Sequence, residues 1–417
     1  MKKAILVALC AVVLICSLSI SSCLYVENDK IPDVDPKWSD DFDLLGKVLT
    51  YVKANYIGDV DLDKLDYITA YSLISALDDF SYMTDEAISL SSNASLGVSI
   101  TKTKYNEYIV NHVYEGFPMG EVKDDGFVVQ RGDHIYAVNG ERVEGAPNSY
   151  FSELVQGGTD KEFVFTITRG GKVMGDYSYT KIEKHVPAAY YISDLDKNNP
   201  NIGYIKLTGF SESKLSTGEV VSASTEFDNC VADMLEDKKT SLILDLRGNP
   251  GGSASILAHI ASYFVPINGK ETVDILSLTY EKKQQEYMVT VSENNYLDMP
   301  VVVLVDENTA SAAEALTGAC RAYNPKATII GTKTFGKGVF QSRSPQIKDT
   351  TSTSYVFDDY YYIMLVSGYY YIIDPNVDGG RYCIHENGIV PDVEVKGTTE
   401  GALENDLEVV EAIKQLT

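Results

Sequence analysis

Basic side chains are scarce in this sequence. The 417 residues include 35 lysines and arginines against 60 aspartates and glutamates, which gives a formal net charge of −25 at pH 7. A surface this acidic repels the phosphates of nucleic acids and of anionic lipid headgroups, so we expect no nucleic-acid partner. Hydrophobic residues make up 44% of the chain, a share that is normal for a globular protein and argues against wholesale disorder.

Metal-ligand patterns are also missing. The sequence has five histidines, and neither they nor the cysteines have the spacing of a zinc site. We expect these histidines to be structural or solvent-exposed rather than catalytic. They are His112, His134, His185, His259 and His385.

Residues 1–22 have the pattern of a targeting segment rather than of a folded element. Two lysines precede an apolar run from Ala4 to about Ile20, which is too short and too close to the start to favour a structural membrane span. Small residues then lead to Cys23. This order resembles a bacterial lipoprotein signal, in which the cysteine is lipidated and becomes the first mature residue.

The resemblance implies an exported bacterial lipoprotein of the cell envelope, in the outer membrane or facing the periplasm. Cys23 would carry the lipid that anchors the protein to a membrane, and residues 23–37 would form a polar tether. An uncleaved membrane anchor, or a signal peptide with a chance cysteine, are the alternatives. Three cysteines then remain in the folded part, an odd number without CxxC spacing, which argues against a disulfide framework. They are Cys230, Cys320 and Cys383.

The length of the chain predicts two or three domains. The first is an N-terminal helical cap over residues 38–92. Apolar residues recur at helical spacing from Phe42 to Tyr56, and a second helical run extends from Leu65 to Leu77.

Residues 93–183 have the alternation of short β-strands. Strand patterns occur at 96–100, 108–113 and 163–170, and an Asn-Gly pair near residue 139 predicts a hairpin turn. This order resembles a PDZ domain of the circularly permuted bacterial kind. A small β-sandwich without a ligand is the alternative.

The PDZ resemblance implies a binding site for a peptide C-terminus. Backbone amides in the loop at Leu96, Gly97 and Val98 would hold the terminal carboxylate of the peptide. Residues 126–130 depart from the family, because they lack its common helix of small residues. The departure weakens the expectation of a standard tail-binding groove.

Residues 184–417 alternate between buried strands and helices. Apolar strand patterns occur at 202–207, 241–246, 301–305 and 327–331. Helical patterns occur at about 217–235, 253–264 and 311–323. Such an alternation predicts an α/β fold with a mostly parallel sheet. A tyrosine-rich segment at 355–373 predicts strands with one wet face.

Two loops at predicted strand ends carry candidate catalytic groups. Gly251 and Gly252 precede a helix, and their lack of side chains lets backbone N–H groups approach an anion, as in an oxyanion hole or a phosphate-binding loop. Ser311 lies at a strand-to-helix turn, where the helix N-terminus favours developing negative charge. A serine that only caps the helix would occupy the same position.

A third loop carries Lys337 between two glycines and apolar neighbours. A poorly solvated amine favours its neutral form, which can accept a proton from a serine hydroxyl. The side-chain carbonyl of Gln341, four residues later, could orient that amine. An exposed lysine in a glycine-rich hairpin is the alternative.

The order and spacing of these loops resemble the carboxyl-terminal processing peptidases, also called tail-specific proteases, which are serine peptidases of family S41. The resemblance implies a crotonase-like α/β core, with an N-terminal helical cap and a PDZ domain inserted before the core. The matching segments cover nearly all of the mature protein. They are 77–82, 93–183, 244–252, 309–314, 335–341 and 388–393.

The family also implies roles for the matched residues. Ser311 would be the nucleophile, Lys337 the general base and later the acid, and Gln341 the residue that orients the lysine. Backbone amides of Ala312 and of Gly251 or Gly252 would stabilise the oxyanion. No metal or organic cofactor is implied.

These implications predict a serine endopeptidase that cleaves exported or tail-marked polypeptides, with the PDZ domain binding their C-terminal tails. One alternative is a catalytically silent PDZ-type peptide-binding lipoprotein, and another is a crotonase-like enzyme that transfers acyl groups of small molecules. The intact Ser311, Lys337 and Gln341 favour the peptidase. The PDZ segment argues against the small-molecule enzyme, because a small substrate needs no tail reader.

Overall fold

The structure is a computed structural model. It describes residues 25–27, 47–48, 62–84, 94–102, 107–215, 218–343, 347–348, 360–397 and 403–417. The chain divides into two compact units. Residues 90–339 and 369–417 belong to one unit, and residues 25–89 and 340–368 belong to the other. The predicted signal sequence, Cys23 and most of the first predicted helical run lie outside the described residues.

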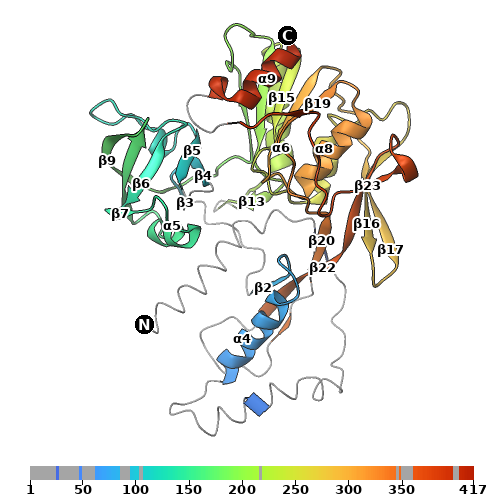
Figure 1. Cartoon of the computed structure of the whole chain (residues 1–417), viewed down its shortest axis with the longest axis horizontal. Helices are drawn as coiled ribbons and strands as arrows, with labels where there is room; N and C mark the ends of the chain where they lie inside the picture. Colours follow the sequence, from blue (N-terminus) through green and yellow to red (C-terminus); the bar gives the residue numbers. More distant parts are fainter. Residues whose placement is uncertain are drawn as a thin grey trace. The chain divides into compact units, whose positions relative to one another are not determined.

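A six-stranded sheet forms the centre of the first unit (Figure 1). Its strands, in spatial order, are β11 (Ala189–Ile192), β12 (Ile202–Leu207), β15 (Ser241–Asp245), β18 (Val301–Val305), β19 (Ala327–Gly331) and β24 (Val393–Glu394). Only β11 is antiparallel to its neighbour, and the other pairs are parallel. Every residue of β15 and β18 is buried, as expected for parallel strands that are covered on both faces. The predicted α/β character is confirmed.

Four helices cover this sheet. They are α6 (Ala223–Glu236), α7 (Ala254–Ala261), α8 (Ala312–Tyr323) and α9 (Leu407–Leu416). Val409 and Ala412 of α9 share a hydrophobic cluster with Ile243 and Val302 of the central strands. Helix α6 packs against β11 and β12, α8 packs against β19, and α7 contacts both α6 and α8. Nearly all side chains of α8 are buried, so its N-terminus lies inside the unit rather than at its surface.

Residues 94–183 form a separate antiparallel sheet within the first unit. Its strands, in spatial order, are β4 (Val98–Lys102), β5 (Tyr108–Val113), β6 (His134–Val138), β8 (Glu162–Arg169) and β9 (Lys172–Thr180), with β7 (Glu141–Arg142) beside β6. Helix α5 (Asn148–Leu154) packs its Phe151 against the apolar core of this sheet. The ends of the segment meet, because β3 (Ala94–Ser95) pairs with β10 (Ile182–Glu183). Such closure is expected of a unit inserted into a chain.

The remaining strands extend the first unit and build the second. In the first unit, β16 (Val273–Tyr280) and β17 (Gln285–Val291) form a hairpin, β13 (Glu212–Lys214) pairs with β14 (Val220–Ser222), and β23 (Arg381–Cys383) pairs with the end of β22 (Tyr360–Ile373). The second unit holds α4 (Leu62–Ser75), β1 (Tyr25–Glu27), β2 (Tyr82–Thr84), β21 (Ile347–Lys348) and most of β20 (Val339–Arg343). Strand β22 runs from the second unit into the first. Short 3₁₀ turns complete the list: η1 (Pro118–Gly120), η2 (Asp378–Gly380) and η3 (Leu403–Asn405).

Several element boundaries differ from the sequence-based expectation. The helix expected from residue 217 begins at Ala223, because 220–222 pairs with 212–214 as strand β14. Ser222 caps the helix by accepting a hydrogen bond from the N–H of Ser224. In the N-terminal region, the helical pattern ends at Ser75. Tyr82–Thr84 instead forms strand β2, antiparallel to β22.

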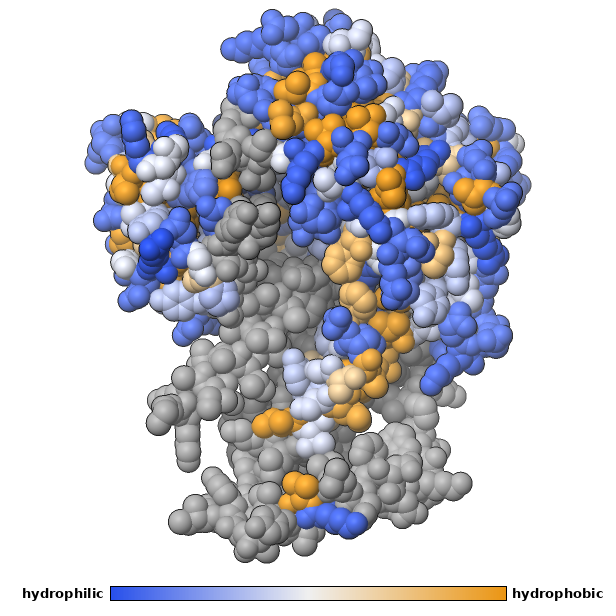
Figure 2. Space-filling model, viewed as in Figure 1, coloured by the Kyte–Doolittle hydropathy of each residue, from blue (hydrophilic) through white to orange (hydrophobic). Residues whose placement is uncertain are grey.

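The side of the molecule in Figure 2 is mostly hydrophilic over the described residues, with apolar side chains in small groups. This distribution agrees with the strongly acidic composition of the chain. Within the described residues, none of the helices combines the length and the apolar character that a bilayer-spanning helix needs.

Candidate functional site

Three loops meet at the carboxyl edge of the central sheet. They follow β15, β18 and β19, and parallel neighbouring strands bring such loops together. Backbone hydrogen bonds join them. The N–H of Ala310 donates to the carbonyl of Asn249 at 2.9 Å, and the N–H of Phe335 donates to the carbonyl of Thr309 at 3.0 Å. The candidate residues of all three loops therefore lie in one region.

Ser311 lies at a strained turn directly before α8. Its φ is 56° and its ψ is −120°, a conformation that a non-glycine residue adopts at a cost of about 1–3 kcal/mol. The side chain is fully buried, and its Oγ has no hydrogen-bond partner among the described residues, including Lys337. A serine on a strained turn between a strand and a helix is the geometry of a nucleophile elbow. An ordinary N-cap serine would instead have extended backbone angles and a bonded hydroxyl.

Gly251 and Gly252 pack closely against neighbouring segments, and Gly251 packs against the turn at Ser311. Gly251 has a φ of +100°, and a Cβ on it would lie 2.7 Å from the Cβ of Ser311 and 2.7 Å from the N of Ala312. A Cβ on Gly252 would lie 2.2 Å from the carbonyl oxygen of Phe210. Any side chain at these positions would force the loops apart, so both positions require glycine.

Asn249 holds the glycine loop in place and decides which amides are free. Its buried side chain accepts a hydrogen bond from the N–H of Gly251 at 2.9 Å and donates to the carbonyl of Leu207 at 2.9 Å. Within the described residues, no hydrogen bond uses the N–H of Gly252 or the N–H of Ala312. Of the sequence-predicted oxyanion donors, Gly252 and Ala312 are thus available, whereas Gly251 is already engaged.

The Glu314 carboxylate connects the serine turn to the lysine loop. It accepts hydrogen bonds from the N–H groups of Ser311 at 2.9 Å, Gly336 at 2.7 Å and Lys337 at 2.9 Å, and from the hydroxyl of Thr334 at 2.6 Å. Burial raises the pKa of this carboxyl, and the four hydrogen bonds act against the rise. One fully buried side chain therefore fixes the backbone of both candidate catalytic residues.

Lys337 is buried, with 6% of its surface exposed. Gly338, the residue after it, packs so closely against the next segment that a Cβ would lie 2.3 Å from the N of His385. The alternative, an exposed lysine in a glycine-rich hairpin, is therefore excluded. The burial matches the poorly solvated amine that the sequence predicts.

Gln341 belongs to strand β20 of the second unit. Its Nε2 donates a hydrogen bond to the carbonyl of Phe80 at 2.7 Å. Its Oε1 is buried and has no partner among the described residues, so this side chain retains one acceptor.

The predicted peptide-binding residues lie at the start of the 94–183 sheet. The side chain of Leu96 belongs to the core of that sheet, and the N–H of Gly97 donates to Ser95 Oγ at 2.9 Å. Val98 begins β4, which is an edge strand that pairs only with β5 among the described strands. The loop is therefore partly engaged in its own hydrogen bonds, whereas one edge of β4 has no strand partner among the described residues.

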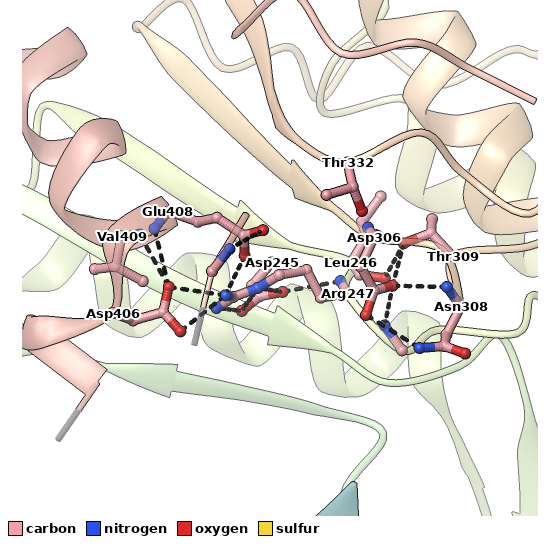
Figure 3. Close-up of polar contacts among 12 residues, drawn as sticks. Asp245, Leu246, Arg247, Asp306, Asn308, Thr309, Thr332, Asp406, Glu408 and Val409 are labelled. Carbon is pink, nitrogen blue, oxygen red and sulfur yellow. Dashed lines mark hydrogen bonds and ion pairs between the residues drawn. The ribbon is translucent and has the colours of Figure 1, made fainter. Parts of the chain in front are cut away.

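A buried ionic cluster supports the start of the glycine loop (Figure 3). Arg247 donates to Asp245 at 2.6 Å and to Asp406 at 3.0 Å, and it also bonds to Glu408, so it ties the loop to the N-terminus of α9. Figure 3 also shows Asp306 beside the same loop, where its carboxylate accepts a hydrogen bond from the N–H of Gly248 at 2.8 Å. The loop is thus held from two sides before it reaches its glycine pair.

Within this cluster, the pKa of Asp245 is lowered and the pKa of Glu408 is raised. Burial alone would raise the pKa of Asp245, but Arg247 and Lys206 outweigh it and hold that pKa well below the usual range. For Glu408, burial dominates and raises the pKa to about 7, although Arg247 acts against it.

The sequence analysis assigned no role to three residues that support the site, namely Glu314, Asn249 and Tyr370. Glu314 carries a recognisable signal, because a glutamate three residues after a helix-capping serine is typical of a capping box. Asn249 bonds to Gly251 two residues later, but its other partner, Leu207, is 42 residues away. Tyr370 carries no comparable local signal, because its hydroxyl bonds to the carbonyl of Ser311, 59 residues away.

Comparison with known proteins bears on this site. Residues 201–395 match the model of peptidase family S41. The chain is similar to the carboxy-terminal processing protease CtpA of Bacillus subtilis (strain 168), at 28% identity over 364 residues, which cover 85% of this chain and 69% of the relative. It is also similar to a probable CtpA-like serine protease of Staphylococcus aureus (strain COL), at 27% identity over 379 residues, which cover 88% of this chain and 67% of the relative.

A solved structure shares the fold. The crystal structure of a putative S41 protease from Bacteroides fragilis NCTC 9343 matches with a TM-score of 0.52 and 18% sequence identity, over 89% of this chain and 92% of that chain.

The titration of Glu408 predicts a pH dependence of stability. A carboxyl with a pKa of about 7 in the folded state and of about 4.3 in the unfolded state binds its proton more tightly when folded. Its contribution to stability is therefore fully present below about pH 4 and is lost as pH rises through about 7. We expect the free energy of unfolding of the parent, relative to Glu408→Gln, to fall by up to about 3 kcal/mol between pH 4 and pH 8.

Chemical unfolding at a series of pH values measures this difference. Glu411→Gln is the matched control, because Glu411 lies on the same helix and hydrogen bonds lower its pKa. Equal pH dependence of the parent and Glu408→Gln would contradict the assignment.

Proposed function

Since the chain is a serine-type peptidase with a family S41 domain, we propose that Ser311 and Lys337 form its catalytic pair and that its substrates are exported polypeptides. The observation that carries the assignment is Ser311 itself, a buried serine on a strained turn with an unpartnered hydroxyl. Strain of this kind persists only where the surrounding structure enforces it, and it is concentrated at functional sites.

In the proposed reaction, the neutral amine of Lys337 accepts the proton of Ser311 Oγ while the oxygen attacks the scissile carbonyl. The resulting ammonium then donates the proton to the leaving amine. Water hydrolyses the acyl-enzyme in a second cycle with the same base. The absence of a Ser311–Lys337 hydrogen bond among the described contacts is compatible with this role, because catalytic hydrogen bonds in unliganded enzymes are often long and form only when substrate binds.

The N–H groups of Gly252 and Ala312 are the proposed oxyanion hole. Their support is that both amides are free, that a close contact brings the glycine pair onto the serine turn, and that Ala312 begins α8, where the helix dipole favours an anion. Loss of one such donor typically lowers kcat by about 10²–10³-fold. Gly251 has a spacing role in this proposal rather than a donor role.

Gln341 is proposed to orient the amine of Lys337. The support is its free, buried Oε1, its position four residues after the lysine, and a side chain already anchored to Phe80 through Nε2. An amide acceptor restricts an amine to one direction without adding charge.

We assign residues 93–183 as a PDZ domain that binds substrate C-terminal tails. The edge of β4 that has no partner among the described strands supports this assignment, because PDZ domains bind a peptide as an added strand on such an edge. Residues 184–417 are assigned as the crotonase-like peptidase core, and residues 38–92 as the N-terminal cap.

We further propose that the protein is a lipoprotein of the bacterial cell envelope, anchored through lipid on Cys23. The support is the basic start, the apolar run and the small residues before the cysteine. An anchor would hold the peptidase beside exported substrates.

Cleavage tests the catalytic pair. The full-length protein in detergent, with Ser311→Ala and Lys337→Ala beside it, is incubated with an unfolded protein that ends in an apolar tail, and the products are identified by intact mass. We expect cleavage by the parent and a loss of about 10⁴-fold or more in each variant, because members of a catalytic unit fail together. Equal cleavage by all three would show that the nucleophile is another residue.

The same substrate with an amidated C-terminus tests whether the proposed PDZ domain binds the substrate tail. Amidation removes the carboxylate that a PDZ loop binds, so we expect kcat/KM to fall about tenfold or more. Unchanged kcat/KM would exclude recognition of the C-terminal carboxylate. Tail binding by a parent that cleaves nothing would instead indicate a silent peptide-binding protein.

Cys23→Ala tests the anchor. In detergent phase separation, we expect the parent expressed in a bacterium to partition into the detergent phase. We expect the variant to enter the aqueous phase or to keep its signal peptide uncleaved. Recovery of the parent in the aqueous phase, without the mass of a lipid on Cys23, would contradict the anchor.

A further inference from the structure

Tyr370 forms hydrogen bonds to the backbones of both proposed catalytic residues. It is fully buried in β22, within the part of that strand that belongs to the first unit. Its hydroxyl donates to the backbone carbonyl of Ser311 at 3.0 Å and also hydrogen-bonds to the backbone carbonyl of Lys337. Its backbone N–H donates to the carbonyl of Gly338 at 2.9 Å.

A phenol has a single proton, so two carbonyls that converge on one hydroxyl share it or take it in turn. Without a donor between them, the two carbonyl dipoles would repel each other across a short, buried distance. The hydroxyl therefore holds the backbones of Ser311 and Lys337 at a fixed separation.

The other end of each residue is held by a different group. The Glu314 carboxylate accepts the N–H of Ser311 and the N–H of Lys337, both at 2.9 Å. Each catalytic residue is thus held at its N–H by Glu314 and at its carbonyl by Tyr370. With both peptide groups fixed, the Cα–Cβ directions of the serine and the lysine are fixed as well.

We propose that Tyr370 is a positioning residue that sets the geometry of the Ser311–Lys337 pair, an inference that rests on the proposed function. Ser311 depends on such help, because its positive φ is stable only where neighbours hold the peptide in place. Tyr370 does not touch the substrate in this account. It acts through the backbone of the two residues that react.

The neighbouring Tyr371 offers a matched control. Tyr371 follows in the same strand, so its side chain points to the opposite face of the sheet, and it is only partly buried. It pairs with Cys383 of β23. Tyr371→Phe removes a hydroxyl of the same chemistry, one residue away, without affecting the two carbonyls.

The experiment compares the full-length parent, Tyr370→Phe and Tyr371→Phe in peptide cleavage, at a temperature where circular dichroism shows all three folded. We expect Tyr370→Phe to lower kcat by about tenfold or more and to change KM by less than about twofold, because a small misplacement of reacting groups lowers the rate of chemistry rather than binding. We expect both constants of Tyr371→Phe to stay within about twofold of the parent. A kcat of Tyr370→Phe within twofold of the parent would overturn the proposal.

A second readout does not need substrate turnover. A small sulfonyl fluoride reacts with an activated serine without filling the peptide groove, and its second-order rate of labelling Ser311 follows the geometry of the pair. We expect Tyr370→Phe to slow labelling by about the same factor as kcat, and Tyr371→Phe to leave it unchanged. Unchanged labelling in Tyr370→Phe would also overturn the proposal. If the parent is labelled at Ser311 but cleaves no polypeptide, the proposed function fails, and the labelling rates still decide the role of Tyr370.

Discussion

The site depends on the hydrogen bonds that the Glu314 carboxylate accepts. It lies in the first turn of α8 and accepts four hydrogen bonds from the serine turn and the lysine loop. A buried carboxylate is costly unless its oxygens are fully bonded, so the four donors and the carboxylate stabilise one another. The parallel sheet brings the loops near each other, but this side chain fixes their distance. Removal of the carboxylate would leave four buried donors without an acceptor.

Side chains from inside and outside the loop also fix the conformation of the glycine loop. Asn249 shapes the loop from within, and the Arg247 cluster holds its first residues against α9. Buried ion pairs often contribute little net stability, because desolvation offsets their attraction. Their value here is geometric, since Arg247 bonds to three carboxylates in defined directions. The C-terminal helix is thereby part of the support of the glycine loop.

The sequence is sufficient to predict the parallel sheet and the position of Ser311 and Lys337 in loops at its edge, because apolar runs and glycine punctuation are local signals. It cannot show the positive φ of Ser311, since the serine turn packs against the glycine loop about 60 residues away. Tyr370 shows the limit clearly. The tyrosine-rich segment predicts strands with a wet face, but the partners of this tyrosine lie 33 and 59 residues away, and no spacing rule identifies them.

The proposed reaction requires the hydroxyl of Ser311 to attack the substrate carbonyl. The most direct measurement is to mix the full-length protein with an activated ester of an apolar peptide, quench the reaction in acid within the first turnover, and locate the acyl group by peptide mapping. We expect one acyl group per active molecule, bound to Ser311. An acyl group on any other residue, or turnover without an acyl-enzyme, would contradict it.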